Sequence, residues 1–165
     1  PINEGSSLGV YICKNKTQFN KNYNKLKKKY EKILVENYIP GKEIQVAIMG
    51  EKALGAIELV PKRQFYDYTA KYSSNAKTKH IMPADLEQKK YKEVLFLGKK
   101  AHKLLGCRGI TRSDFRFYND KFYLLETNTQ PGMTKLSLVP EIANYCGIKF
   151  EDLVDWMLKD ASTNR

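Results

Sequence analysis

The residues best suited to chemistry lie in two segments that have the pattern of neighbouring strands, residues 108–118 and 122–128. Successive side chains of a strand point to opposite faces of the sheet. The first segment therefore places an acid between two arginines on one face, and the second places an acid and an amide on one face. The charged and amide side chains are Arg112, Asp114, Arg116, Glu126 and Asn128.

Pairing these two segments as a hairpin brings the acids together. If residues 119–121 form the loop, Asp114 lies opposite Glu126, and Arg112 lies opposite Asn128. Two carboxylates in that position repel each other by up to roughly 1 kcal/mol. A divalent cation would reverse the sign of this term, and carboxylate and amide oxygens are the ligands that Mg²⁺ accepts. Arg112 suits a phosphate group.

Two alternatives to this metal site stay open on the residues alone. The face could be a solvated polar surface that holds no metal. A two-residue turn would also place the two acids on opposite faces of the sheet, because the pairing would shift by one residue.

Two loops could also contribute to a site. The segment EGSSLG at residues 4–9, which includes Ser6, could surround a phosphate, although it lacks the Gly-Lys-Ser/Thr element of a P-loop. Residues 62–80 interleave aromatic and basic side chains. That composition fits a lid that closes over a substrate, a surface that stacks on bases, or a loop without a role.

Composition excludes several classes of protein. No apolar run is long enough to span a membrane. His80 and His102 are too few and too far apart for a zinc site, and three distant cysteines do not suggest a disulfide framework. The net charge of +11 invites a nucleic-acid interpretation. Most of the basic residues are lysines, however, and the abundance of Lys, Asn, Ile and Tyr resembles the coding bias of an AT-rich genome.

The elements that would position these residues alternate between helices and strand pairs. We expect a helix over 17–33 with Thr17 as N-cap, an extended segment over 34–39, and a hairpin of strands 43–49 and 53–60. A long loop at 62–80 precedes a helix over 85–105, capped by Asp85. The second hairpin and helices over 138–146 and 151–160 complete the chain. This order predicts an α+β fold built on antiparallel sheet.

Taken together, the segments resemble the C-terminal half of a D-alanine–D-alanine ligase of the ATP-grasp superfamily. The matching pieces are NEGSSLGV (3–10), VENYIPGKEIQVAIMG (35–50), ELVPKRQFYDYTAKY (58–72), HIMPA (80–84), AHKLLGCRGITRSDFRF (101–117), YLLETNTQPGMTKLSLVPEIA (123–143) and GIKFEDLVDWMLKDA (147–161). The resemblance implies an ATP-grasp C-terminal lobe together with a remnant of the central lobe. It also implies a ligase that joins two D-alanines through an acyl phosphate, for peptidoglycan synthesis.

The resemblance assigns roles to the residues of the second hairpin and of the loop that follows it. Asp114, Glu126 and Asn128 would hold two Mg²⁺ ions, for which Mn²⁺ could substitute. Arg112 and the backbone N–H of Gly132 would stabilise the oxyanion of the tetrahedral intermediate.

Other roles implied by the resemblance concern ATP, the second D-alanine and closure of the loop. The segment Glu36, Asn37, Tyr38 and Ile39 would hold the adenine, Glu43 the ribose, and Lys71 the phosphates. Ser137 and Leu138 would bind the carboxylate of the second D-alanine. Ser6 and Tyr72 would belong to the hydrogen-bond network that closes the 62–80 loop.

The upstream half of the family pattern has no counterpart in these residues. We therefore expect residues 1–35 to be the tail of the central lobe and residues 36–165 to form the C-terminal lobe. We expect the chain to be a fragment that is inactive alone and needs the upstream half. Homodimerisation, cytoplasmic location and the absence of membrane association are further expectations. The alternatives are a ligase that makes D-alanyl-D-lactate and a basic nucleic-acid-binding module.

Overall fold

The computed structural model describes residues 1–5, 7–61, 78–134 and 136–163. Their contacts divide the chain into two compact units, Pro1–Ile39 with Pro61–Thr78, and Pro40–Val60 with Lys79–Arg165. The expected division at residues 35 and 36 concerns the lobes of the family and stays a prediction.

The first unit contains one described helix, α1 (Lys16–Lys27). Asn15 caps it, because the Asn15 side chain accepts a hydrogen bond from the Gln18 N–H at 2.9 Å. Thr17 as N-cap and a helix end at residue 33 were therefore wrong predictions. No residue of α1 is buried, so no packing extends the helix past its lysine-rich last turn.

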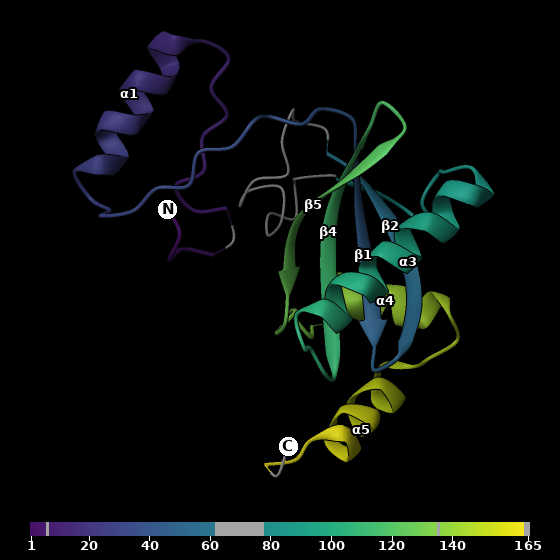
Figure 1. Ribbon diagram of the computed structural model, residues 1–165. Coiled ribbons are helices and arrows are strands. Elements are labelled where there is room, and N and C mark those ends of the chain that lie inside the picture. The colour runs from purple at the N-terminus through teal and green to yellow at the C-terminus, as the bar shows by residue number, and fades with distance from the viewer. Residues whose placement is uncertain (6, 62–77, 135, 164–165) are drawn as a thin grey trace. The chain divides into compact units, whose positions relative to one another are not determined.

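The second unit is built on a five-stranded antiparallel sheet, shown in Figure 1. The strands are β1 (Lys42–Met49), β2 (Lys52–Val60), β3 (Lys79–Ile81), β4 (Ile110–Tyr118) and β5 (Lys121–Asn128), in the spatial order β3-β2-β1-β4-β5. The two predicted hairpins are confirmed as β1–β2 and β4–β5. Strand β3 was not predicted, because three residues are too few to show an alternating pattern.

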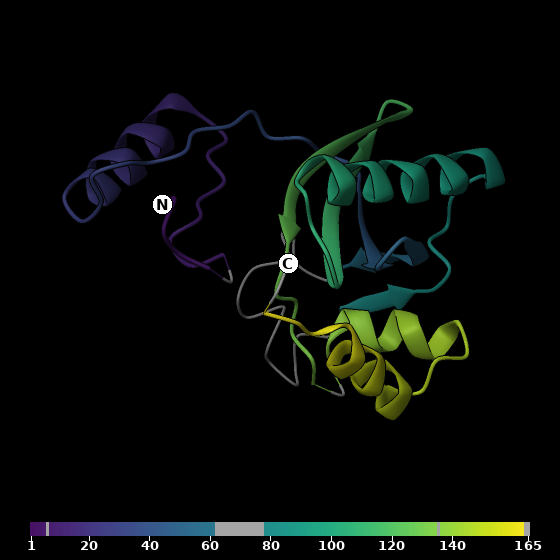
Figure 2. The ribbon, with the colours of Figure 1, turned by 60° about the horizontal axis from the view of Figure 1, so that its bottom comes forward.

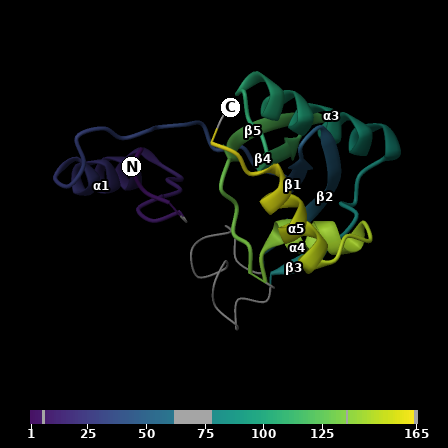
Figure 3. The same ribbon diagram turned by 90° about the horizontal axis from the view of Figure 1, so that it is seen from below.

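Helix α3 (Gln88–Leu104) covers one face of the sheet, and helices α4 (Leu138–Tyr145) and α5 (Phe150–Asp160) lie on the other side (Figures 2 and 3). Helix α3 begins three residues later than predicted. Asp85 does not cap it, because the Asp85 carboxylate binds the Lys42 ammonium group at 2.9 Å. That hydrogen bond lowers the pKa of Asp85 below its ordinary value.

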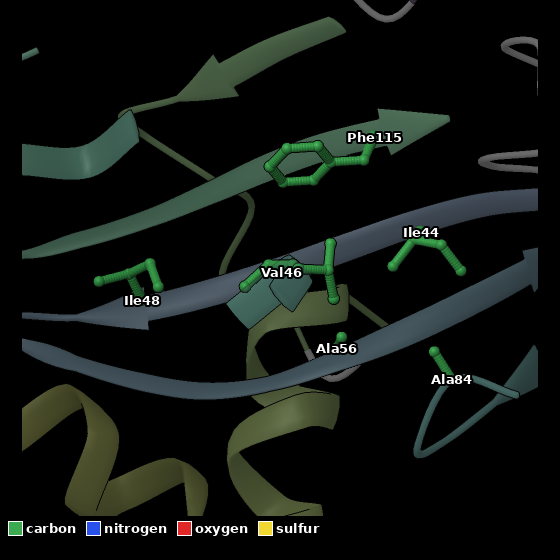
Figure 4. Packing of buried hydrophobic residues seen from close by; sticks show 7 residues of the cluster. Ile44, Val46, Ile48, Ala56, Ala84 and Phe115 are labelled. Atoms are coloured by element: carbon green, nitrogen blue, oxygen red, sulfur yellow. The ribbon is translucent and has the colours of Figure 1, made fainter. Parts of the chain in front are cut away.

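The main core lies between α3 and the sheet. Ile44, Val46 and Ile48 point to this face from β1, and Phe115 joins them from β4 (Figure 4). Helix α3 approaches β1 closely at Gly98, where a Cβ atom would lie 2.8 Å from Val46 Cγ1. The helices and the antiparallel sheet confirm the predicted α+β class.

Candidate functional site

The face of the sheet opposite α3 carries charge where α4 does not cover it. Helix α4 contacts β1 and β2, whereas α3 contacts all four of the strands β1, β2, β4 and β5. On β4, alternation sends Phe115 toward α3 and Asp114 to the opposite face. Arg112 and Arg116 share the face of Asp114, so the predicted chemical residues of β4 lie together.

The turn between β4 and β5 differs from the prediction. Tyr118 pairs with Lys121, and Asn119 and Asp120 have φ angles of +48° and +59°. Two consecutive residues with positive φ form a type I′ turn, so the loop has two residues and the three-residue loop was wrong.

A β-bulge nevertheless restores the predicted pairing. The register shifts between Asp114 and Phe115, because Phe115 pairs with Leu124 while Asp114 pairs with Glu126, which leaves Leu125 as the extra residue. Arg112 then pairs with Asn128. The two acids therefore lie opposite each other, as the sequence predicted, but the bulge rather than the turn produces this arrangement.

Arg112 compensates the charge of the facing acids. Its Nε donates to Asp114 Oδ1 at 2.7 Å, and its Nη2 donates to Asp114 Oδ2 at 2.9 Å. Its Nη2 is also 3.9 Å from Glu126 Oε1. The Arg112 and Asp114 side chains are only 14% and 9% exposed, whereas Glu126 is 62% exposed. This two-pronged ion pair is shielded from water, and Glu126 reaches solvent.

The donor set fits a hard divalent cation. Asp114 and Glu126 provide carboxylate oxygens, and Asn128 adds an amide oxygen that already accepts the Gln130 N–H at 2.9 Å. Within the described part of the chain, no three His, Cys, Asp or Glu side chains gather closely enough to hold a metal ion. The candidate ligands are two acids and one asparagine, so they do not form such a group of three. The guanidinium of Arg112 supplies the positive charge beside both acids in this structure.

A second charged pair continues the same face. Arg116 Nη1 donates to Glu43 Oε2 at 3.2 Å, and both side chains are largely buried. Gln45, the next residue of β1 on this face, pairs in register with Asp114. Gln45 is 1% exposed, and its Oε1 is a buried side-chain atom without a hydrogen-bond partner among the described residues. Such an orphaned acceptor costs about 1–3 kcal/mol.

The loop after β5 places the remaining predicted residues of this unit near one another. A Cβ atom on Gly132 would lie 2.9 Å from Ser137 Oγ. Ser137 is the N-cap of α4, and its Oγ accepts the Thr134 N–H at 3.0 Å. Leu138 is the first residue of α4, where the helix N-terminus favours an anionic group.

Of the other predicted site residues, Glu43 alone lies on this face among the described residues. Glu36, Asn37, Tyr38 and Ile39 belong to the first unit, whereas Glu43 belongs to the second. Ser6, Lys71 and Tyr72 lie outside the described residues. Sequence reasoning did not assign roles to Gln45 and Arg116. The alternation of β1 could have drawn attention to Gln45, since Ile44, Val46 and Ile48 define one face and leave Gln45 on the other.

Comparison with known proteins identifies the family. The family model described as "D-ala D-ala ligase C-terminus" matches residues 1–159. The chain belongs to this family. It is 62% identical over 165 residues to a D-alanine--D-alanine ligase of Pelagibacter ubique, covering 100% of the chain and 54% of that relative.

Solved structures of the family agree with the fold. The D-alanine--D-alanine ligase from Bacillus anthracis matches with a TM-score of 0.81 and 31% identity, over 94% of this chain and 51% of that one. The same ligase complexed with ATP matches with a TM-score of 0.78 and 28% identity, over 92% of this chain and 49% of that one. This family member therefore spans about half the length of the relatives it matches.

Among the helices in the described parts of the chain, none has the length and apolar composition needed to cross a membrane.

Proposed function

We propose that this chain supplies the ATP, divalent-cation and second-substrate sites of an enzyme that joins two D-alanines into D-alanyl-D-alanine. One observation carries the proposal: Asp114 faces Glu126 on the sheet face opposite α3, beside Arg112 and Asn128, in a chain that matches the ligase family model. Facing carboxylates are unfavourable unless a cation compensates them.

The proposed metal ligands are Asp114, Glu126 and Asn128, which would hold two Mg²⁺ or Mn²⁺ ions. When held by these residues, the ions would supply positive charge against the phosphoryl group that ATP would transfer to the carboxylate of the first D-alanine. Because Arg112 now binds Asp114 through two hydrogen bonds, the site would form as Arg112 exchanges part of that contact for a phosphate or an oxyanion.

Binding of the second D-alanine is proposed at the start of α4. Ser137 and Leu138 would take its carboxylate, since N–H groups at a helix N-terminus favour an anion. The amine of this D-alanine would attack the carbonyl carbon of the acyl phosphate, and Arg112 and the Gly132 N–H would stabilise the resulting oxyanion. The intermediate would then collapse to the dipeptide as the C–O bond to phosphate breaks and phosphate leaves. Gly132 lies close to the Ser137 hydroxyl, so the two functions would be adjacent.

The roles proposed for ATP binding follow from the family to which the chain belongs. Glu36 to Ile39 would bind the adenine, Glu43 the ribose and Lys71 the phosphates, while Ser6 and Tyr72 would help to enclose the site. The ion pair between Arg116 and Glu43 supports the proposed role of Glu43, because it fixes the carboxylate that would accept hydrogen bonds from the ribose hydroxyl groups. A homodimer, an upstream partner segment, a cytoplasmic location and a role in peptidoglycan synthesis belong to the same proposal.

The direct test measures D-alanine-dependent phosphate release from MgATP. The 165-residue chain would be assayed alone and with the upstream half of the Pelagibacter ubique ligase supplied as a second polypeptide. We expect no turnover from the chain alone. The mixture should release phosphate and form D-alanyl-D-alanine, identified by mass spectrometry.

Three outcomes would contradict the proposal or a part of it. If the mixture binds no nucleotide and releases no phosphate, the assigned sites are wrong. If D-alanine with D-lactate gives the depsipeptide in preference to the dipeptide, the acceptor is wrong and the D-alanyl-D-lactate alternative replaces it. Turnover by the chain alone would show that the upstream half is dispensable.

A further inference from the structure

Gln45 has an unusual position for a buried amide. It lies in the middle of β1, is 1% exposed, and has an Oε1 without a hydrogen-bond partner among the described residues. Buried polar atoms in folded proteins are nearly always paired, so an orphaned oxygen at this depth indicates a missing donor.

The position of Gln45 suggests where that donor would lie. Gln45 pairs with Asp114 across β1 and β4, and Asp114 pairs with Glu126 across β4 and β5. Directly paired residues of an antiparallel sheet share a face. Three oxygen-bearing side chains therefore form one row across three strands, with neighbouring strands about 4.8 Å apart.

The arginines on this face are directed to the acids. Arg112 donates two hydrogen bonds to Asp114, and Arg116 donates to Glu43, the residue two positions before Gln45. Gln45 lies in one row with the carboxylates of Asp114 and Glu126. The missing donor to its neutral amide oxygen is therefore expected to be a group that these two carboxylates attract. A hydrated divalent cation is such a donor, since Mg²⁺ usually keeps several of its water molecules in protein sites.

We propose that the Gln45 side-chain oxygen accepts a hydrogen bond from a water molecule bound to the divalent cation that Asp114 and Glu126 hold. Gln45 is then a positioning residue, because it orients a water of the cation rather than contacting the reacting groups. This inference rests on the proposed function of the acid pair. It goes further because the resemblance to the ligases assigns no role to Gln45.

The test uses Mn²⁺ as the probe, with electron paramagnetic resonance to measure the free ion in the presence of the 165-residue chain and ATP. In Gln45→Met the side chain keeps its length and loses the amide oxygen. We expect the Mn²⁺ dissociation constant to rise about tenfold, the lower end of the effects seen when groups around metal ligands are removed. Metal-free Gln45→Met should melt no lower than the unmodified chain, because it removes an unsatisfied buried oxygen.

A second variant keeps the inference testable if Gln45→Met does not fold. Gln45→Glu adds a carboxylate beside Asp114, so it should lower the melting temperature without cation and tighten Mn²⁺ binding. Gln88→Met, at an exposed glutamine in the first turn of α3, is the matched control and should leave both quantities unchanged.

Three results would overturn the inference, and they are distinguishable. An unchanged Mn²⁺ affinity in Gln45→Met would show a structural role only. Gln45→Met could weaken Mn²⁺ binding with ATP but not when inorganic tripolyphosphate replaces ATP. That result would mean that the Gln45 oxygen accepts a hydrogen bond from a ribose hydroxyl instead. If the unmodified chain binds no Mn²⁺ under either condition, the proposed function of the acid pair fails as well.

Discussion

The two faces of the central sheet differ most where β1 lies beside β4. Toward α3, Ile44, Val46 and Phe115 are fully or almost fully buried and form a continuous apolar core. On the other face, the neighbouring positions Gln45 and Asp114 are almost as buried, yet they are polar and lie beside ion pairs. Burial alone therefore does not distinguish core from site in this sheet, whereas, among the described residues, the buried ion pairs and the unpaired oxygen of Gln45 do.

Phe115→Ala should have the largest effect on the apolar face. Removing this ring leaves a cavity beside Ile44 and Val46. It also removes an edge-to-face contact with Phe122, in which the two ring centroids are 6.2 Å apart. We expect a loss of about 3–5 kcal/mol in the free energy of unfolding, measured by urea denaturation. A loss below 1 kcal/mol would mean that Phe115 is not part of the main core.

Arg112→Ala should be the most damaging change on the charged face. It leaves the Asp114 carboxylate buried without its two guanidinium hydrogen bonds, and we expect a loss of about 3 kcal/mol. Added Mn²⁺ should restore more stability in this variant than in the unmodified chain, because the cation would replace the missing positive charge.

Arg108→Ala is the matched control, since Arg108 forms a partly exposed 3.8 Å pair with the Asp160 carboxylate and donates to the Asp160 carbonyl oxygen at 2.7 Å. Its effect should stay below about 1 kcal/mol. Equal losses in the two arginine variants would contradict the special position of Arg112.

Gly98→Ala tests how tightly α3 is packed on the apolar face. Alanine gains about 1 kcal/mol in helix propensity over glycine. Its Cβ, however, would meet Val46 Cγ1 at 2.8 Å and Val46 Cβ at 3.1 Å, and overpacking costs about 1–3 kcal/mol. We expect a net destabilisation of about 1 kcal/mol by thermal unfolding. Gly5→Ala, where nothing lies within 4 Å of the added Cβ, should show no steric cost.

His102 should give a smaller effect, visible as a pH dependence. It is buried on α3, within hydrogen-bond distance of Thr111, and burial lowers its pKa below the ordinary value of 6.5. As the pH falls below about 6.5, the His102 side chain takes up a proton more readily in the unfolded chain than in the folded one. The free energy of unfolding should therefore fall as the pH drops through this region. His102→Gln should remove this part of the slope between pH 7 and pH 5. An unchanged slope would mean that His102 is as readily protonated in the folded chain as in the unfolded one.

The sequence predicted much of this arrangement, but not how the acids come to face each other. Alternation in strands β1, β2, β4 and β5 identified both hairpins, and an assumed three-residue loop at 119–121 placed Asp114 opposite Glu126. The turn was wrong, because Asn119 and Asp120 both adopt positive φ, and the bulge at Leu125 that compensates for it has no signature in LLETN. Asp85 was misassigned as a helix cap because its partner, Lys42, is distant in the sequence. The orphaned oxygen of Gln45 depends on three-dimensional surroundings that no local pattern contains.

The measurement that tests the central claim most directly is the affinity of the Asp114→Asn variant for Mn²⁺ in the presence of ATP, determined by isothermal titration calorimetry. Asp120→Asn is the control, because Asp120 lies in the exposed turn of the same hairpin and asparagine tolerates its positive φ. If Asp114 and Glu126 hold the cation, Asp114→Asn should bind Mn²⁺ at least about tenfold more weakly, and Asp120→Asn should bind it with unchanged affinity. Equal binding by Asp114→Asn and the unmodified chain would contradict a cation site between β4 and β5.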